Sequence, residues 1–265
     1  MTGVIILTIT GVLLAVAIGL VTRFFGIKQN PLAEKLQAIM PGANCGGCGF
    51  AGCADYVDAM VNGKAQPGLC PSMSAEALKI ASTLLGQDVV VKERKVALIA
   101  CSGDDAHAVR RGLYNGVTDC KNAAMVAGGG KGCLYGCLGL GSCARICPFG
   151  AIEITGKHLA RVHADLCTGC GKCVSACPRR LIRLVPRTSR IHVYCSNPEV
   201  GKNKLPICSD ACIGCRKCAK ASKEGQMQFN GFLASINYDN PPDETLAQTC
   251  PTGALRNQND APRGK

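Results

Sequence analysis

The sequence predicts an α+β fold in which a single membrane helix precedes three small cysteine-rich domains. Three observations predict it: an apolar N-terminal stretch, 20 cysteines in short regular spacings, and a C-terminal part that repeats itself. The expected boundaries are a membrane anchor over 1–28, a four-cysteine domain over 29–90, related modules over 91–187 and 188–256, and a disordered tail over 257–265.

The N-terminal stretch runs from Thr2 to Thr22 without a charged residue. About 20 residues at about 1.5 Å each cross the hydrocarbon core of a bilayer, so this stretch predicts one spanning helix. A cleaved signal peptide is disfavoured because no basic segment precedes the stretch and no small-residue cleavage site follows it. Arg23, Lys28 and Lys35 follow the stretch, which predicts that the C-terminal domains lie in the cytoplasm.

A small four-cysteine domain is expected next. Asn30-Pro31 is typical of a helix start and Pro41-Gly42 of a helix end. A C-x2-C-x4-C-x16-C pattern follows, with glycines that allow the backbone to approach a 4Fe-4S cluster closely. Its ligands, for cluster 1, are Cys45, Cys48, Cys53 and Cys70. Further helices are expected around 56–61 and over 74–85, and strands over 89–91 and 96–100.

The most specific motif is the C-x2-C-x2-C-x3-C-P run from Cys167 to Pro178. It is typical of bacterial ferredoxins, in which three thiolates bind one 4Fe-4S cluster and the fourth binds a neighbouring one. A zinc ribbon is disfavoured because zinc sites use two separated C-x2-C pairs. By the same cross-ligation rule, the ligands of cluster 2 are Cys147, Cys167, Cys170 and Cys173.

An internal repeat relates the two C-terminal modules. A shift of 75 residues pairs Cys120 with Cys195, and it also pairs the cysteines at 133, 137 and 143 with those at 208, 212 and 218. The second copy lacks one whole cluster, because Ser222 replaces the counterpart of Cys147 and no cysteine lies between 218 and 250. It keeps the other, cluster 4, with ligands Cys212, Cys215, Cys218 and Cys250.

Cluster 3 of the first copy is short of one ligand, because Leu140 stands where the second copy has Cys215. Three ligands are Cys137, Cys143 and Cys177, and the fourth is Cys133, Cys120 or Cys101. We expect Cys133 because it is nearest in sequence. Four thiols then remain: Cys101, Cys120, Cys195 and Cys208. They either form a fifth cluster between the copies or are buried or free thiols without a metal. Four clusters are thus expected, and a fifth is left open.

Composition and the weaker motifs exclude other functions. The formal net charge of +12 falls to roughly +4 with four oxidised clusters, since each adds about −2. Nucleic-acid binding is disfavoured by the absence of Trp and of any recognition motif. The Gly128–Lys131 segment lacks the Ser or Thr of a phosphate loop, and the four histidines show no Rieske pairing. Five arginines between 179 and 190 form a basic run that is either solvated or docks an acidic partner.

The order of these motifs resembles a known family. A membrane helix, a PGANCGGCGFAGC segment continuing to Cys70-Pro71, and C-terminal ferredoxin modules together resemble the B subunits of Rnf complexes, which are membrane ion-translocating ferredoxin:NAD oxidoreductases. The resemblance covers nearly the whole chain. It implies a single-pass subunit of the bacterial inner membrane that takes electrons from soluble ferredoxin or flavodoxin. It further implies that this subunit passes the electrons to membrane and peripheral subunits, which hold flavins, reduce NAD and move Na+ or H+. Many family members carry one complete two-cluster module, so the half-lost second copy departs from the pattern.

The residues themselves agree with an electron-transfer role. No acid/base constellation or nucleotide loop is present, so the chain is expected to act as a subunit of a translocase without a bond-making site of its own. The sequence leaves two alternatives open. One is the iron-sulfur subunit of another membrane oxidoreductase, of the hydrogenase or molybdenum-enzyme type, and the other is a membrane-tethered redox sensor or cluster scaffold.

Overall fold

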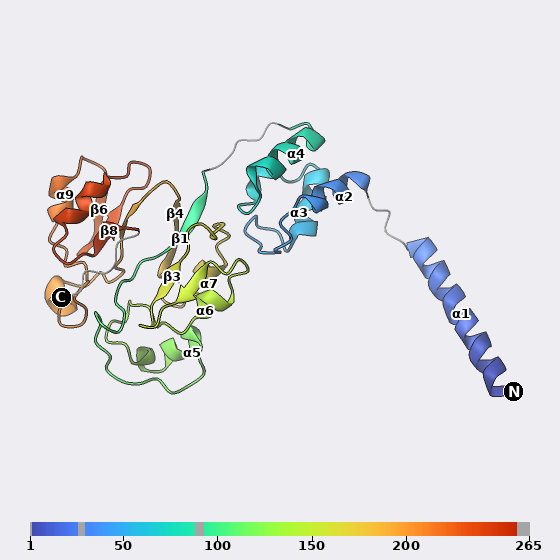
Figure 1. The fold of residues 1–265 in the computed structure, drawn as a ribbon, viewed down its shortest axis with the longest axis horizontal. Helices are drawn as coiled ribbons and strands as arrows, with labels where there is room; N and C mark the ends of the chain where they lie inside the picture. Colours follow the sequence, from blue (N-terminus) through green and yellow to red (C-terminus); the bar gives the residue numbers. More distant parts are fainter. Residues whose placement is uncertain (1, 26–29, 88–92, 259–265) are drawn as a thin grey trace.

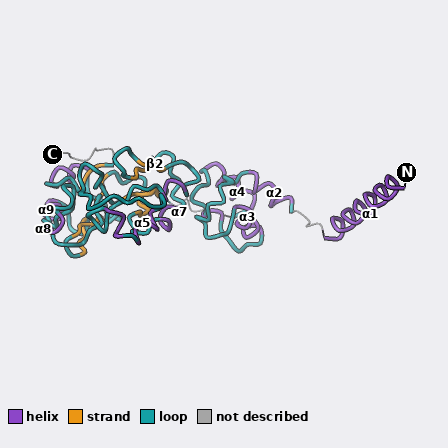
Figure 2. Tube along the Cα trace, turned by 90° about the horizontal axis from the view of Figure 1, so that it is seen from below, coloured by secondary structure: helices purple, strands orange, loops and turns teal. Residues whose placement is uncertain are grey.

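The protein consists of a separate N-terminal helix, a small helical domain and two α+β modules packed against each other. The computed structural model describes residues 2–25, 30–87 and 93–258. Figures 1 and 2 show these parts following one another along the longest axis, with α1 (Thr2–Phe25) at one end and the second module at the other. The expected strand over 89–91 and residues 259–265 of the expected tail lie outside the described residues.

Helix α1 is long and apolar enough to cross a membrane over Thr2–Phe24. Its apolar side chains are exposed rather than packed against the rest of the chain, as expected for a helix whose solvent is lipid. The hydroxyls of Thr8, Thr10 and Thr22 donate to carbonyl oxygens three and four residues earlier. These hydroxyl groups therefore have hydrogen-bond partners without water.

The helical domain contains the three helices that the sequence predicts. Asn30 caps the first of them, since its side chain accepts a hydrogen bond from Leu32 N–H. Ser74 caps the last helix, and Gly86 ends it in the left-handed conformation. Their apolar faces meet around Tyr56, whose hydroxyl donates to the carbonyl oxygens of Gln66 and Pro67. The elements are α2 (Pro31–Ala38), α3 (Cys53–Val61), η1 (Pro67–Leu69) and α4 (Ala75–Leu85).

The first module is closed by its first and last strands. β1 (Lys95–Ile99) pairs antiparallel with β4 (Ile182–Pro186), with Ala97 opposite Leu184. Between them β2 (Ile152–Ile154) forms a hairpin with β3 (Ala160–Val162). The strand expected over 96–100 is therefore confirmed, one residue earlier. The helical segments are α5 (Cys120–Met125), η2 (Ala127–Gly130), α6 (Ser142–Arg145) and α7 (Lys172–Ala176).

The second module repeats this arrangement. β5 (Ile191–Val193) pairs with β8 (Leu255–Asn257), and β6 (Met227–Asn230) forms the inner hairpin with β7 (Leu233–Ile236). The shared topology is the structural counterpart of the 75-residue repeat. The helical segments are α8 (Gly201–Lys204), α9 (Lys217–Ala221) and η3 (Glu244–Thr249).

The two modules pack against each other along β1 and β4. Val96, Leu98 and Val185 are buried there against Tyr194 and Tyr238 of the second module. The long segment that follows β1 also pairs with the second module, since Val109 N–H donates to Ile207 O at 2.8 Å and Ala108 forms a bridge with Cys208. The modules therefore share an interface that is both apolar and hydrogen-bonded.

Candidate metal centres

Cysteines from distant parts of the chain meet in small cavities. All 20 are free thiols, and all lie in the described residues. Across residues 2–25, 30–87 and 93–258, no three Cys, His, Asp or Glu side chains converge closely enough to hold one metal ion. Instead, four cavities of about 320 to 400 Å³ are each lined by four cysteines. Four thiols spread around a cavity suit a 4Fe-4S cluster, whose four irons each take one thiolate.

Site 2 lies between the ferredoxin run and β1. Its cavity is about 320 Å³ and is lined by Cys147, Cys167, Cys170 and Cys173. Backbone N–H groups point at two of the sulfurs, from Ala97 to Cys167 at 3.3 Å and from Ala151 to Cys147 at 3.4 Å. Such N–H···S hydrogen bonds stabilise thiolates and tune a bound cluster. The four cysteines are the set that the sequence predicts for cluster 2.

Glycine is required at one turn of site 2. Gly169 has a φ of +73°, and a Cβ there would collide with the carbonyl oxygen of Lys95 on β1. The loop therefore packs directly on the strand, which brings Cys167 to Ala97 N–H.

Site 3 contains Cys120 and not Cys133. Its cavity of about 380 Å³ is lined by Cys120, Cys137, Cys143 and Cys177. Burial raises the pKa of Cys143 to about 12, and the thiols of Cys137, Cys120 and Cys177 add to the shift, which places all four together. The structure thus differs from the expectation that Cys133 completes this set.

Local contacts explain how Cys120 reaches site 3. Its backbone N–H donates to the Ser142 hydroxyl at 2.9 Å, and that hydroxyl donates to the Asp119 carboxylate at 2.8 Å. Asp119 is also the N-cap of α5, so the same side chain starts the helix and attaches it to α6. Because Ser142 precedes Cys143, these contacts bring Cys120 beside that thiol. Sequence spacing carries no signal for this contact across 22 residues.

Site 4 lies in the second module at the end of the molecule away from α1 (Figure 1). Its cavity of about 370 Å³ is lined by Cys212, Cys215, Cys218 and Cys250, the set that the sequence predicts for cluster 4. Leu255 N–H donates to the Cys250 sulfur at 3.4 Å. Cys215 is exposed, so this site lies at the protein surface.

Site 1 belongs to the helical domain and touches site 2. Burial raises the pKa of Cys70, and the thiols of Cys45 and Cys48 add to the shift, which places these three near one another. Cys53 opens α3, and its N–H donates to the Asn44 side chain at 2.8 Å. These four are the cysteines predicted for cluster 1.

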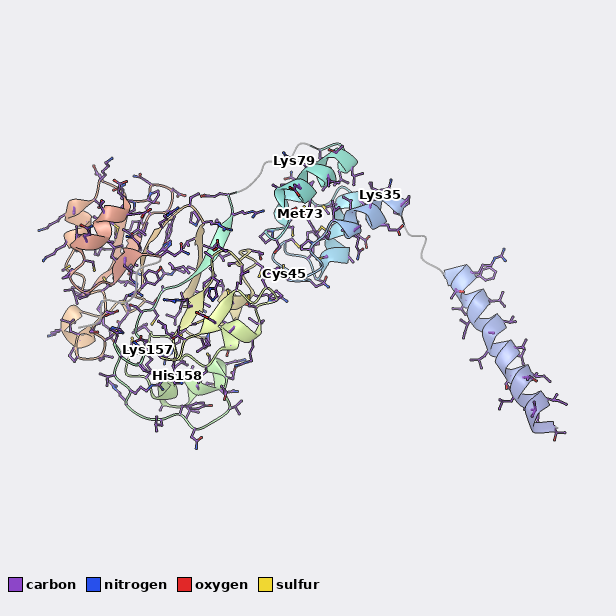
Figure 3. The ribbon with its side chains drawn as sticks, in the orientation of Figure 1. Lys35, Cys45, Met73, Lys79, Lys157 and His158 are labelled. Atoms are coloured by element: carbon purple, nitrogen blue, oxygen red, sulfur yellow. The ribbon has the colours of Figure 1, made fainter. Side chains whose placement is uncertain are left out.

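Contacts between the helical domain and the first module join sites 1 and 2. The Ser72 hydroxyl donates to Thr168 Oγ1 at 2.9 Å. A Cβ on Gly47 would lie 3.0 Å from the carbonyl oxygen of Cys170, so glycine permits this approach. Figure 3 shows Cys45 on the side of the helical domain that faces the first module.

A fourth cavity, which we call the junction site, lies between the two modules. It measures about 400 Å³ and is lined by Cys101 and Cys133 of the first module and by Cys195 and Cys208 of the second. Burial raises the pKa of Cys208 to about 12, with the thiols of Cys101 and Cys195 adding to the shift. The four leftover thiols that the sequence suggested included Cys120, and the structure places Cys133 in its position.

The weaker sequence signals have other roles in the structure. Lys131, at the end of the glycine segment, is buried and donates to the carbonyl oxygens of Gly103 and Cys137. Arg179, the first of the basic run, donates to the carbonyl oxygens of Cys133 and Gly128. Among the described residues, no histidine lines a four-cysteine cavity.

Comparisons with known proteins give the same order of domains. A family of Fe-S cluster domains matches residues 40–72, and two families of 4Fe-4S dicluster domains match residues 135–184 and 166–221. The chain is similar to the B subunit of the ion-translocating oxidoreductase complex of Methanosarcina acetivorans, with 37% identity over 229 residues, 86% of this chain and 85% of that protein.

Two further relatives carry more specific names. The B subunit of the Na(+)-translocating ferredoxin:NAD(+) oxidoreductase complex of Acetobacterium woodii is 38% identical over 197 residues, 74% of this chain. The chain spans 59% of that relative's length. The B subunit of the proton-translocating ferredoxin:NAD(+) oxidoreductase complex of Clostridium ljungdahlii is 36% identical over 199 residues, 74% of this chain and 70% of that protein.

Proposed function

Because the chain belongs to the B subunits of Rnf-type ion-translocating ferredoxin:NAD oxidoreductase complexes, which are iron-sulfur electron-transfer subunits, we propose that it carries electrons from a soluble ferredoxin or flavodoxin toward partner subunits at the membrane. The observation that carries the proposal is the succession of four-cysteine sites between an exposed basic end and the domain next to the membrane helix.

The ligand sets follow from how the thiols are grouped. We assign 4Fe-4S clusters to site 2, site 3 with Cys120, and site 4, each of which is a cavity lined by four cysteines, and to site 1, where Cys45, Cys48 and Cys70 lie near one another and Cys53 completes the motif. The free thiols and the N–H groups directed at sulfur fit such a group. When bound, a cluster of this kind takes up and releases one electron. The chain contributes the order of the sites, their shielding from water and the charges around them.

Contacts between ligands support this order. Sites 1 and 2 adjoin through Cys45 and Cys170, since the first thiol contributes to the raised pKa of the second after burial. Sites 2 and 3 share one apolar core, in which Cys143 and Cys173 are both buried. Site 1 lies in the domain that follows α1, so an electron that leaves from this end is delivered near the membrane (Figure 2).

The opposite end fits an acidic electron donor. Cys215 is exposed there, and four exposed basic residues follow it within the next eight positions of the sequence. They are Arg216, Lys217, Lys220 and Lys223, with Glu224 as the one acid within the same stretch. A positive patch around the exposed site steers an acidic protein and increases its association rate. We call these four residues the α9 patch.

Orientation and partners complete the proposal. We propose that the modules lie in the cytoplasm, with α1 as a single-pass anchor in the cytoplasmic membrane, and the basic residues Arg23, Lys28 and Lys35 support this orientation. The relatives' names include ferredoxin, NAD(+) and a translocated ion. We accordingly propose that electrons leaving site 1 reach subunits of the complex that reduce NAD and move Na+ or H+.

Stopped-flow reduction by ferredoxin tests the proposal. Purified, cluster-loaded full chain is mixed anaerobically with reduced ferredoxin, and cluster absorbance is followed at low and high salt. The double variant Lys217→Glu/Lys220→Glu is expected to lower the association rate constant about tenfold or more at low salt, with little difference at high salt. Lys79→Glu, an exposed position on the helical domain (Figure 3), is the matched control.

Two results are decisive. Equal rates for the double variant and the wild type at low salt would refute docking on the α9 patch. A loaded wild-type chain that ferredoxin does not reduce at all would refute the electron-transfer function itself.

A further inference from the structure

We propose that the junction site binds a fifth 4Fe-4S cluster, held by Cys101 and Cys133 from one module and by Cys195 and Cys208 from the other. Like sites 2, 3 and 4, the site is a cavity lined by four thiols. Neither dicluster family match covers all four of these cysteines. The ligand set therefore rests on the cavity, while the role argued below rests on the proposed electron-transfer function.

Hydrogen bonds prepare two junction sulfurs to act as thiolates. Cys101 accepts from the backbone N–H of Cys137 at 3.3 Å, and Cys133 accepts from the Asn197 side chain at 3.8 Å. N–H donors directed at sulfur are typical of cluster ligands. Cys195 and Cys208 line the same cavity, and the thiols of Cys101 and Cys195 add to the raised pKa of Cys208 after burial.

Two buried lysines line the same cavity. Lys131 and Lys204 are 5% and 1% exposed, and both donate to backbone carbonyl oxygens. In the described part of the chain, neither lysine forms an ion pair with a carboxylate. A buried charge is costly unless an opposite charge accompanies it.

A cluster provides that opposite charge. Binding a preformed cluster core of charge about +2 releases four thiol protons and leaves a net charge of about −2 on the oxidised site. Uptake of one electron changes this to about −3, with no other bond made or broken. Asp210 also lines the cavity, and its carboxylate lies 3.6 Å from Arg256, so the two lysines remain to offset the charge of the oxidised junction site.

The junction site also fills a gap in the path of electrons. The N–H of Cys137, a site 3 ligand, donates to Cys101 at 3.3 Å. Cys195 lies near Cys212, a site 4 ligand, since the Cys212 thiol adds to the raised pKa of Cys195 after burial. The junction thiols thus adjoin ligands of the neighbouring sites on both sides. Electrons that arrive at site 4 pass to the first module through this site.

Metal analysis of cysteine variants tests the inference. Anaerobically purified full chain is expected to hold about 20 irons and 20 sulfides, and Cys133→Ala or Cys208→Ala about 16. The double variant Cys133→Ala/Cys208→Ala is also expected to hold about 16, because both residues serve one cluster. Cys120→Ala, the matched control, removes site 3, so Cys120→Ala/Cys133→Ala is expected to hold about 12.

Other outcomes overturn the inference without touching the proposed function. A wild-type chain with about 16 irons and no loss in Cys133→Ala would show that the junction holds no cluster. About 16 irons in Cys120→Ala/Cys133→Ala would place both cysteines at one site. Wild-type chain with about 16 irons and one zinc would assign the junction to zinc. Spin quantitation on fully reduced wild type, with five spins expected, decides the question even if a variant fails to fold. A wild type without iron would refute the proposed function as well.

Discussion

Replacing Lys204 by methionine should lower the reduction potential of one cluster selectively. Lys204 is buried beside the junction cavity, and its Nζ donates to Asn197 O at 3.0 Å and to Phe232 O at 3.1 Å. A positive charge stabilises the reduced cluster, of charge about −3, more than the oxidised cluster, of charge about −2. Its removal therefore makes the cluster harder to reduce. Methionine keeps most of the side-chain volume.

The size of the effect follows from Coulomb's law. Lys204 lines the junction cavity, so we take a separation of about 6 to 10 Å between its ammonium group and the cluster centre. At an effective dielectric constant of about 20, one unit of charge at such a distance is worth about 2 to 3 kcal/mol. For a one-electron couple this equals about 0.1 V.

Potentiometric titration followed by EPR measures this shift. Lys204→Met should lower one couple by about 0.1 V and the others by less, because they lie farther from Lys204. Lys131→Met should lower the same couple and also that of site 3, since Lys131 donates to the Cys137 carbonyl oxygen, whereas exposed Lys202→Met should shift none by more than about 20 mV. If no couple moves in Lys204→Met, or if one rises, the charge argument for the junction site is wrong.

Three further predictions concern stability and membrane attachment. Gly169→Ala should lower the free energy of unfolding by about 2 to 5 kcal/mol and remove about four irons, because its Cβ would meet the carbonyl oxygen of Lys95. Gly150→Ala, also at positive φ but in open space, should lower the free energy of unfolding by about 1 kcal/mol. Thermal unfolding and iron analysis compare the two variants, and equal losses would contradict the packing argument. Burial lowers the pKa of His192 to about 4, so the folded chain binds fewer protons than the unfolded chain between about pH 4 and 6.5 and its stability falls as pH drops through this window. Between pH 6.5 and 5 the loss is about 2 kcal/mol, and His192→Phe should flatten the dependence of melting temperature on pH; an unchanged profile would show that His192 does not cause it. Deletion of residues 2–25 should release the chain, expressed alone, into the soluble fraction, and a truncated chain that still sediments with membranes would rule out α1 as the anchor.

Local spacing predicted the parts of the structure that are local. The helix bounded by Ser74 and Gly86 is found because capping side chains act within one turn. The cysteines within Cys167–Cys173 and within Cys212–Cys218 each line one cavity because each set lies in one short segment, which the ferredoxin spacing describes directly. The repeat likewise predicted two modules of one topology.

Long-range contacts decided what spacing could not predict. Cys120 lies at site 3 and Cys133 at the junction site, opposite to the expectation, because of the path of the segment after β1. Two hydrogen bonds fix this path, one from Cys120 N–H to the Ser142 hydroxyl and one from Arg179 to the Cys133 carbonyl oxygen. Neither contact has a sequence signature. The basic run that begins at Arg179 is likewise divided in the structure, since Arg179 holds this segment while Arg187 pairs with Asp165. The α9 patch is a second group of exposed basic side chains next to a cysteine site, besides the exposed arginines of this run.

The junction cavity takes two thiols from each module, and this has a consequence for how the protein is made. A ribosome releases Cys101 and Cys133 well before Cys195 and Cys208, and N-terminal domains fold first. On our assignment, the first module can fold and bind its clusters as soon as it leaves the ribosome. The junction site, however, has only two of its four cysteines until the second module has been synthesised. The junction cluster, inserted only after Cys208 has emerged, then joins the two modules, so a nascent chain that stalls between them would expose the thiols of Cys101 and Cys133 to oxidation.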